Sequence, residues 1–482
     1  MKINLNIIFS IFFTNLFLAH FSFKTDLIYL KLFSLIIFLL FFIYLKVFLT
    51  NVLNFRNIKS IIFKEKLVLL SFIPFLLIMY FNSNDLTVKE VILQKNLINN
   101  IINIDIIKNN SFLSKIIEIM AINNIAITIL ISFSIFVIFV IFNNRIDIFK
   151  VFIYSGLIVS FFTLVNLIIT TYLIENGIGK SYLKYYGANQ FIYFQFVPFG
   201  KMGFRNIEVF PMLIGYICSI YLAIESRGNK FLFISCFLMV SLFLTFSRLA
   251  WCVTFISLLY LILKFNYLQT YKIILIKFTT LIISIVIISS IWSYSPNNTP
   301  KVNIIYYSLM KLSTLINNQQ LIDFFNTKND SLLIYYDTGY DKVDGKLSNK
   351  DYFKVINRVN FYLNSNVERK DIYLQSIELI KKKKLFGYGQ LNFAYLNKSE
   401  YKDQIIINRG NAESQFLQLL LENGIFGFFA YFLIYLSIYL SGLNRKGKYL
   451  LLISFTYSFF LVTQVYYFFW IILLSSLAYK KQ

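Results

Sequence analysis

The sequence predicts an all-α polytopic membrane protein with about 12 transmembrane helices and one large periplasmic loop near the C-terminal end. Two observations indicate this class. The 482 residues are 58% hydrophobic and only 14% charged, whereas a soluble domain is about 25% charged. Apolar runs of roughly 18 residues or more also recur along the chain, and each is long enough to cross a hydrocarbon core of roughly 30 Å.

The charge balance favours lipid and anionic partners. Lysine and arginine total 46 against 23 acidic residues, which gives a net charge of +23. In a soluble protein this surplus would favour nucleic acid, but in a membrane protein it indicates anionic lipid surfaces and an anionic substrate. Three cysteines without paired spacing and a single histidine argue against a transition-metal site. We therefore expect membrane lipids as partners, no nucleic acid, and no metal or cofactor.

The short loops between the apolar runs set the orientation. When the N-terminus is cytoplasmic, five short basic segments all lie inside, as the positive-inside rule requires. The long polar segments 82–115, 175–205 and 293–411 then lie outside. The predicted spans are residues 5–21, 27–49, 67–81, 116–142, 148–174, 207–224, 231–246, 249–263, 273–292, 425–440, and two short helices within 449–478.

The last apolar stretch, residues 449–478, would be about 45 Å long as one helix. We expect two short helices that turn near Gln464 and return the C-terminus to the cytoplasm. The predicted division is therefore an N-terminal helix bundle (1–292), a large periplasmic loop with short helices (293–411), and C-terminal transmembrane helices (412–482). The localisation that follows is a multi-pass protein of a bacterial inner membrane.

Chemistry is expected at the end of the large loop. Residues 368–384 form a plausible helix with Tyr373, Ile377 and Ile380 on one face, a lysine run at its end, and Gly387 after it. A surface helix alone would also explain the lysines. Further along, Asn411 is placed to cap a helix that begins at Ala412 and bends near Gly424 or stands clear of the membrane core.

Four arginines lie on the outer side or at its membrane boundary: Arg205, Arg248, Arg369 and Arg409. Guanidinium groups pair with phosphate oxygens through two parallel hydrogen bonds, so converging arginines would suit a diphosphate. Arg248 follows Phe246-Ser247 between two apolar runs and would be costly in a bilayer without a partner or a function. A structural ion pair is the alternative for Arg248.

Three motifs resemble the O-antigen polymerase and O-antigen ligase superfamily. They are R-K-D-I-Y-L-Q-S-I (369–377), L-F-G-Y-G (385–389) and A-E-S-Q-F-L-Q-L-L-L-E-N-G-I-F-G (412–427). Phe246-Ser247-Arg248 is similar to the family's Ser-Arg motif, and Arg205 ahead of Pro211 is a looser match. Ligases of this family typically carry a histidine where this chain has Glu413, and a glutamate there is more similar to the polymerase branch.

The resemblance implies a metal-independent glycosyltransferase that joins undecaprenyl-diphosphate-linked oligosaccharide repeat units at the periplasmic face, for O-antigen or capsule. It also implies roles for particular residues. Glu413 would be the catalytic base or orient the acceptor hydroxyl, and the four arginines with Gly387 and Gly389 would bind substrate. A chain-length regulator and a flippase are the expected protein partners. The alternatives are a ligase, and a lipid-linked oligosaccharide flippase or other transporter, for which internal repeats would be expected.

The topology can be tested with reporter fusions. A reporter after Asn349 should read as periplasmic and one at Gln482 as cytoplasmic, because the short basic loops all fall on one side. Alkaline phosphatase and green fluorescent protein fusions at both positions would measure this. A cytoplasmic signal at Asn349 would contradict the predicted outer loop, and a periplasmic signal at Gln482 would contradict the final pair of helices.

Overall fold

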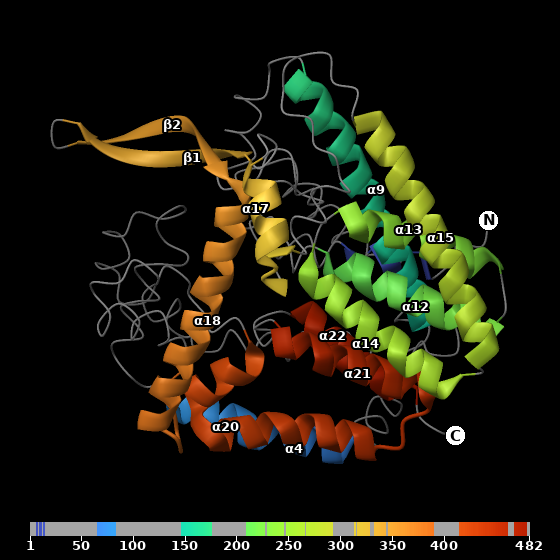
Figure 1. The fold of residues 1–482 in the computed structure, drawn as a ribbon. Coiled ribbons are helices and arrows are strands. Elements are labelled where there is room, and N and C mark those ends of the chain that lie inside the picture. The colour runs from blue at the N-terminus through green and yellow to red at the C-terminus, as the bar shows by residue number, and fades with distance from the viewer. Residues whose placement is uncertain are drawn as a thin grey trace. The chain divides into compact units, whose positions relative to one another are not determined.

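A computed structural model describes twelve stretches of the chain. Its described residues are 6–14 (without 8 and 12), 65–82, 146–175, 209–226, 229–244, 247–265, 267–292, 313–327 (without 315), 332–343, 346–389, 414–460 and 467–479. These residues are helical apart from one β-hairpin (Figure 1). The helical class is therefore confirmed for the described part of the chain, whereas the predicted spans 27–49 and 116–142 lie outside it.

The chain divides into two compact units, and both are discontinuous in sequence. Unit 1 contains residues 1–51 and 145–366, and unit 2 contains residues 52–144 and 367–482. This grouping differs from the three consecutive segments expected from sequence, because unit 2 joins an early helix to the C-terminal helices. The early helix is α4 (Lys66–Asn82), and it packs on α20 (Gln415–Leu440).

Unit 1 is a helical bundle in which α9 (Ile148–Glu175) and α12 (Phe210–Ser226) cross closely. A Cβ at Gly215 would lie 2.9 Å from the Phe152 carbonyl oxygen and 3.0 Å from the Gly156 Cα. Only glycine therefore allows the two backbones to approach so closely. Further described helices of this unit are α13 (Asn229–Leu244), α14 (Arg248–Lys264), α15 (Tyr267–Trp292) and α17 (Gln319–Thr327).

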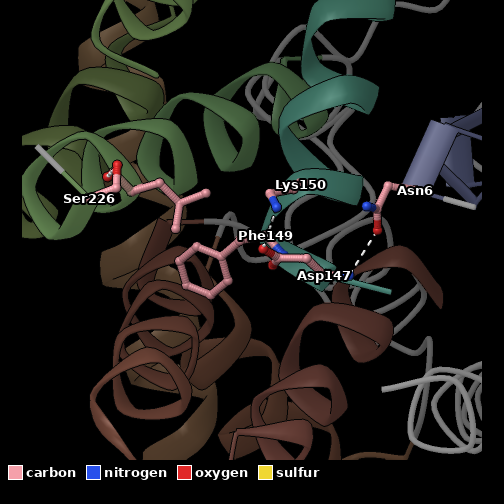
Figure 2. A network of polar contacts seen from close by, with 6 residues as sticks. Asn6, Asp147, Phe149, Lys150 and Ser226 are labelled. Carbon is pink, nitrogen blue, oxygen red and sulfur yellow. Dashed lines mark hydrogen bonds and ion pairs between the residues drawn. The ribbon is translucent and has the colours of Figure 1, made fainter. Parts of the chain in front are cut away.

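The start of α9 is fixed by a short polar network (Figure 2). The side chain of Asp147 accepts a hydrogen bond from the Phe149 N–H at 3.1 Å, which satisfies a helix-end donor. The Asp147 N–H donates to Asn6 Oδ1 at 2.8 Å, and Lys150 Nζ lies 3.5 Å from the Asp147 carboxylate. The N-terminal helical residues are thus attached to α9, and a second contact joins Thr14 Oγ1 to Ser155 Oγ at 2.7 Å.

The predicted outer loop contains a β-hairpin that the sequence interpretation did not include. β1 (Leu332–Val343) pairs antiparallel with β2 (Lys346–Asn357), with Leu332 opposite Asn357 and Val343 opposite Lys346. In the sequence Asp344 and Gly345 stand between the strands, and an Asp-Gly pair is a strong hairpin signal. The hairpin is followed directly by α18 (Arg358–Lys382).

Unit 2 is built around α20. α4 runs antiparallel to it, because Ser71 Oγ lies 2.8 Å from Ser437 Oγ while the rings of Phe75 and Tyr431 are 5.5 Å apart. Trp470 completes this aromatic core, with its ring 5.9 Å from that of Tyr431. Interlocking rings of this kind bury large areas in specific tilted geometries.

The C-terminal stretch forms two short helices, as expected from its length. α21 (Arg445–Phe460) is followed by α22 (Tyr467–Ser475) and a 3₁₀ turn (Ser476–Ala478). The Asn444 N–H donates to the Tyr479 carbonyl at 2.8 Å, so the chain returns to the end at which α21 began. The turn itself, with Gln464, lies outside the described residues.

The helix surfaces expose apolar side chains in stripes. On α4, Leu67, Leu70, Ile73 and Leu77 are all about half exposed, at helical spacing, and α20 exposes Phe429, Leu433, Leu436 and Leu440. Such continuous apolar faces are incompatible with water and are typical of helices that contact lipid. By length and composition, α20 is the one helix among the described residues that is long and apolar enough to cross a membrane.

Candidate functional site at a glycine junction

Two of the motifs found in the sequence meet in unit 2 and are joined by four backbone hydrogen bonds. The Ile425 and Phe426 N–H groups donate to the carbonyls of Lys384 and Leu385 at 2.9 and 3.4 Å. In the other direction, the Tyr388 and Gly389 N–H groups donate to the carbonyls of Leu421 and Glu422 at 2.9 and 2.8 Å. We call residues 384–389 and 421–426 together the glycine junction.

Glycine is required at this junction for two reasons. Gly387, Gly389 and Gly424 have φ angles of 70°, 93° and 63°, in the left-handed region that L side chains rarely adopt. The backbones are also in contact. A Cβ at Gly424 would lie 2.2 Å from the Leu385 carbonyl oxygen, and one at Gly387 would lie 2.6 Å from the Glu422 carbonyl oxygen. The two motifs therefore contact each other through their backbone atoms, and side chains at Gly387 and Gly424 would prevent this contact.

Gly424 divides α20 into two parts, which confirms the predicted bend. Its φ and ψ of 63° and −165° interrupt the helix. We call residues 415–423 the arm of α20 and residues 425–440 its stem. The arm folds back toward the stem, because the rings of Phe416 and Tyr431 are only 6.3 Å apart, whereas an unbroken helix would separate these residues by about 22 Å.

The second half of α18 packs on the arm. Ile372, Leu379 and Leu421 form a buried cluster, and the buried Ser376 donates its hydroxyl proton to the Ile372 carbonyl at 2.7 Å. Of the three residues expected to share one face of this helix, Tyr373 and Ile380 are partly buried, whereas Ile377 is 41% exposed. The apolar spacing alone pointed to Ile377, but Ser376 can be buried there because the helix itself satisfies its hydroxyl. α18 is also longer at its N-terminal end than predicted, beginning at Arg358 and ending at Lys382.

The arm carries a buried polar face that sequence reasoning missed. Gln415, Gln418 and Glu422 lie at helical spacing, and each side chain is at most 2% exposed. Gln418 Nε2 donates to Glu422 Oε1, and the adjacent Asn423 is also buried. The polar positions 415, 418 and 422 within an apolar run were the available signal.

Only some of the predicted site residues fall within the described part of the chain. Arg369 lies on α18, partly buried, one turn before Ile372. Arg248 is the first residue of α14, whose N-cap Ser247 accepts a hydrogen bond from the Ala250 N–H at 3.3 Å. A cation at a helix N-terminus opposes the helix dipole, so helix stability does not account for Arg248. These two arginines belong to different units, so their predicted convergence stays a prediction.

The remaining predicted residues, Arg205, Arg409 and Glu413, lie outside the described residues. The start of the helix after the loop is nevertheless visible and differs from the prediction. α20 begins at Gln415 with the extended Ser414 at its N-cap, rather than at Ala412 after a capping Asn411. Serine is a favoured N-cap residue, and Glu413 therefore precedes the helix instead of occupying its first turn. Its role as base or orienting group stays a prediction.

Gly387 and Gly389 have a clear structural role, because their backbone forms the glycine junction. Their predicted contact with substrate is a separate matter and stays a prediction. Within the described residues, no group of three or more His, Cys, Asp or Glu side chains could hold a metal ion.

Comparison with known proteins agrees with the position of these motifs. Residues 232–432 match the model of a family described as O-Antigen ligase. The matched range contains Arg248, Arg369 and the whole glycine junction, and it ends in the stem of α20. The match supports the resemblance to the O-antigen polymerase and ligase superfamily over this part of the chain, without separating its polymerases from its ligases. No curated protein and no solved structure matches the chain.

The junction predicts a specific loss of stability. Gly424→Ala adds a methyl group against the Leu385 backbone as well as strain at positive φ, so we expect unfolding to become easier by about 2–5 kcal/mol. Gly442→Ala is the matched control, because Gly442 also has a positive φ of 82° but nothing lies within 4 Å of its Cβ position. Thermal unfolding of both variants in detergent would measure the difference. Equal shifts in the two variants would contradict the backbone contact.

Proposed function

We propose that this protein is a repeat-unit polymerase, and the match of residues 232–432 to a family described as O-Antigen ligase supports the proposal. It joins undecaprenyl-diphosphate-linked oligosaccharides by glycosyl transfer at the periplasmic face of a bacterial inner membrane, without a metal or cofactor. The chain crosses the membrane several times with both termini in the cytoplasm. A flippase supplies its lipid-linked substrate, and a chain-length regulator acts on its product.

The observation that carries the proposal is the glycine junction. It holds the end of α18 against the bend of α20, so the segments 369–389 and 414–427 are one structural unit. The arm of α20 has a buried polar face, while the stem exposes apolar side chains on its surface. A lipid-linked sugar is likewise divided into a polar part, the sugar and its diphosphate, and an apolar part, the polyprenyl chain. Glu413 lies two residues before the start of this arm in the sequence.

In the proposed reaction, the hydroxyl oxygen of the acceptor sugar forms a bond to the anomeric carbon of the donor chain. The bond between that carbon and the diphosphate oxygen breaks, and the electron pair leaves with the polyprenyl diphosphate. Arg205, Arg248, Arg369 and Arg409 stabilise the charge that develops on the diphosphate. Glu413 orients the acceptor hydroxyl and receives or directs its proton.

A ligase is the nearest alternative, and the glutamate at position 413 in place of a histidine favours the polymerase. A transporter is less well supported, although α15 does carry a buried charge. Lys277 is 3% exposed and lies 5.0 Å from the centre of the Tyr216 ring. A cation over an aromatic ring is stabilised by the ring itself, so this lysine has a structural explanation.

Reconstitution tests the proposal directly. The purified full-length protein in proteoliposomes, supplied with lipid-linked repeat units alone, should produce a ladder of lipid-linked polymers. A ligase would instead leave the units unextended and transfer them only when a second acceptor, such as a lipid A core, is added. Movement of units across the bilayer without new glycosidic bonds would favour the transporter.

The arginine roles predict a loss of activity on substitution by lysine. Arg248→Lys and Arg369→Lys keep the charge but remove the two-pronged donor, so polymer synthesis should fall by about 10- to 100-fold, the equivalent of one charge-assisted hydrogen bond. Arg445→Lys, at an exposed position at the start of α21, is the control and should behave as wild type. Initial rates of ladder formation at equal protein levels measure this, and full activity in both test variants would rule the roles out.

Glu413 predicts a separable effect. Glu413→Gln keeps the shape and hydrogen-bonding ability of the side chain but removes its charge, so the transfer rate should fall by roughly 10²-fold or more if the carboxylate acts as base. Binding of the lipid-linked unit should be retained. Glu378→Gln, at an exposed position on α18, is the control. Chains of normal length made at a normal rate by Glu413→Gln would mean that another group accepts the proton.

A further inference from the structure

Beside the glycine junction lies an exposed surface that the proposed reaction does not use. Four consecutive lysines, Lys381–Lys384, are all exposed, and they comprise the last two residues of α18 and the two residues that follow it. The next two residues are apolar and also exposed, Leu385 by 56% and Phe386 by 60%. Exposure of the two apolar side chains to water is unfavourable. At a membrane surface, the apolar side chains can enter the lipid while the lysines contact the headgroups.

The junction fixes this surface relative to the stem of α20. The carbonyls of Lys384 and Leu385 accept hydrogen bonds from the first two N–H groups of the stem. The ring of Phe386 lies 5.2 Å from that of Phe426, which is itself 46% exposed. The apolar end of the surface is therefore continuous with the apolar face of the stem, including Phe429, which is 55% exposed.

The depth of the lysines in a membrane follows from this geometry. The stem, residues 425–440, is about 24 Å long at 1.5 Å per residue, a little less than the roughly 30 Å of a hydrocarbon core. A stem that spans the core would therefore place its first residues near one edge of the core, and the Lys384 carbonyl accepts a hydrogen bond from the Ile425 N–H. Lysine side chains extend from that level toward the headgroups while their methylene stems stay in the apolar region.

The surface is positively charged, and one of its lysines contacts an aromatic ring of the junction. Lys383 Nζ lies 4.7 Å from the centre of the Tyr388 ring, in the loop of the junction. The acidic side chain nearest in the sequence is the exposed Glu378, one turn before Lys382, so the net charge of residues 378–386 is positive. Phosphodiester groups at the membrane surface complement this charge.

From these observations we propose that Lys381–Lys384, Leu385, Phe386 and Phe426 form a binding surface for anionic glycerophospholipids of the surrounding bilayer. The lysines bind the phosphate groups, and the aromatic residues contact the acyl chains. Bound lipid also holds the end of α18 at the membrane surface and so stabilises the glycine junction. A substrate diphosphate fits this surface less well, because the side chains of the surface are exposed, whereas the proposed reaction takes place beside the buried arm of α20.

Nanodiscs containing the full-length protein test this surface. Discs of phosphatidylcholine with and without about one third phosphatidylglycerol would be compared by two measurements, which are the lipid retained by the protein in native mass spectrometry and the midpoint of thermal unfolding. The test variant replaces all four lysines by glutamine, and a second variant replaces them by arginine, which keeps the charge. Lys370→Gln, an exposed lysine earlier on α18, is the control substitution.

Wild type, the four-arginine variant and Lys370→Gln should retain phosphatidylglycerol in preference to phosphatidylcholine and unfold at a higher temperature when it is present. In the four-glutamine variant, the ratio of retained phosphatidylglycerol to retained phosphatidylcholine should fall by at least about tenfold. Each lysine near a membrane surface raises the affinity for anionic lipid by about fivefold. Equal retention of phosphatidylglycerol by the four-glutamine variant and wild type would overturn the proposal. Displacement of the lipid by millimolar inorganic diphosphate would also overturn it, because the surface would then be a site for free or substrate diphosphate. Neither measurement depends on glycosyl transfer, so failure here leaves the proposed function untouched.

Discussion

The need to satisfy backbone hydrogen bonds at a broken helix determines how the glycine junction of unit 2 is built. At Gly424 the helix loses its regular N–H to carbonyl pairing, and an unpaired backbone group costs several kcal/mol in hydrocarbon. The loop 384–389 supplies the missing partners, two acceptors for the stem and two donors for the arm. Because backbone must approach backbone, the contact positions at Gly387 and Gly424 exclude any side chain. The bend and the loop can therefore exist only together.

This dependence changes what the glycine motifs mean. Read as sequence, the paired glycines of L-F-G-Y-G suggested direct contact with a substrate. In the structure Gly389 donates its N–H to Glu422 and Gly387 packs on the same carbonyl. Their first role is to position α18 and the arm of α20, the two elements that carry Arg369 and the residues after Glu413. A motif of this kind can be essential for activity without touching a reacting atom, because a misplaced arm would displace every group on it.

The sequence predicted the parts of the fold that depend on local pattern. Apolar runs located several of the described helices within a few residues, for example α4 and α9, and the length of the last run required the two helices α21 and α22. Features that depend on tertiary contact were harder to predict. The arm folds back because the loop completes its hydrogen bonds, and Ser376 replaces Ile377 on the inner face because the helix satisfies its hydroxyl. The β-hairpin is an intermediate case, because Asp344-Gly345 is a local hairpin signal but the strands that flank it do not alternate regularly between apolar and polar residues.

Unit 2 combines two opposite solvent preferences around a single residue. On the C-terminal side of Gly424, the stem exposes apolar side chains on its outer surface. Its inner face carries small polar groups that form hydrogen bonds, as Ser437 does with Ser71. On the N-terminal side of Gly424, the arm buries the side chains of Gln415, Gln418 and Glu422 inside the protein. Burial of amides and a carboxylate is favourable only when their hydrogen bonds are made, and Gln418 and Glu422 supply part of them to each other. A straight helix of the same sequence would carry these polar side chains in line with an apolar span. The bend instead separates a lipid-facing segment from a protein-facing polar one, and this is the separation that an enzyme needs if one half of its substrate is a sugar and the other half a lipid.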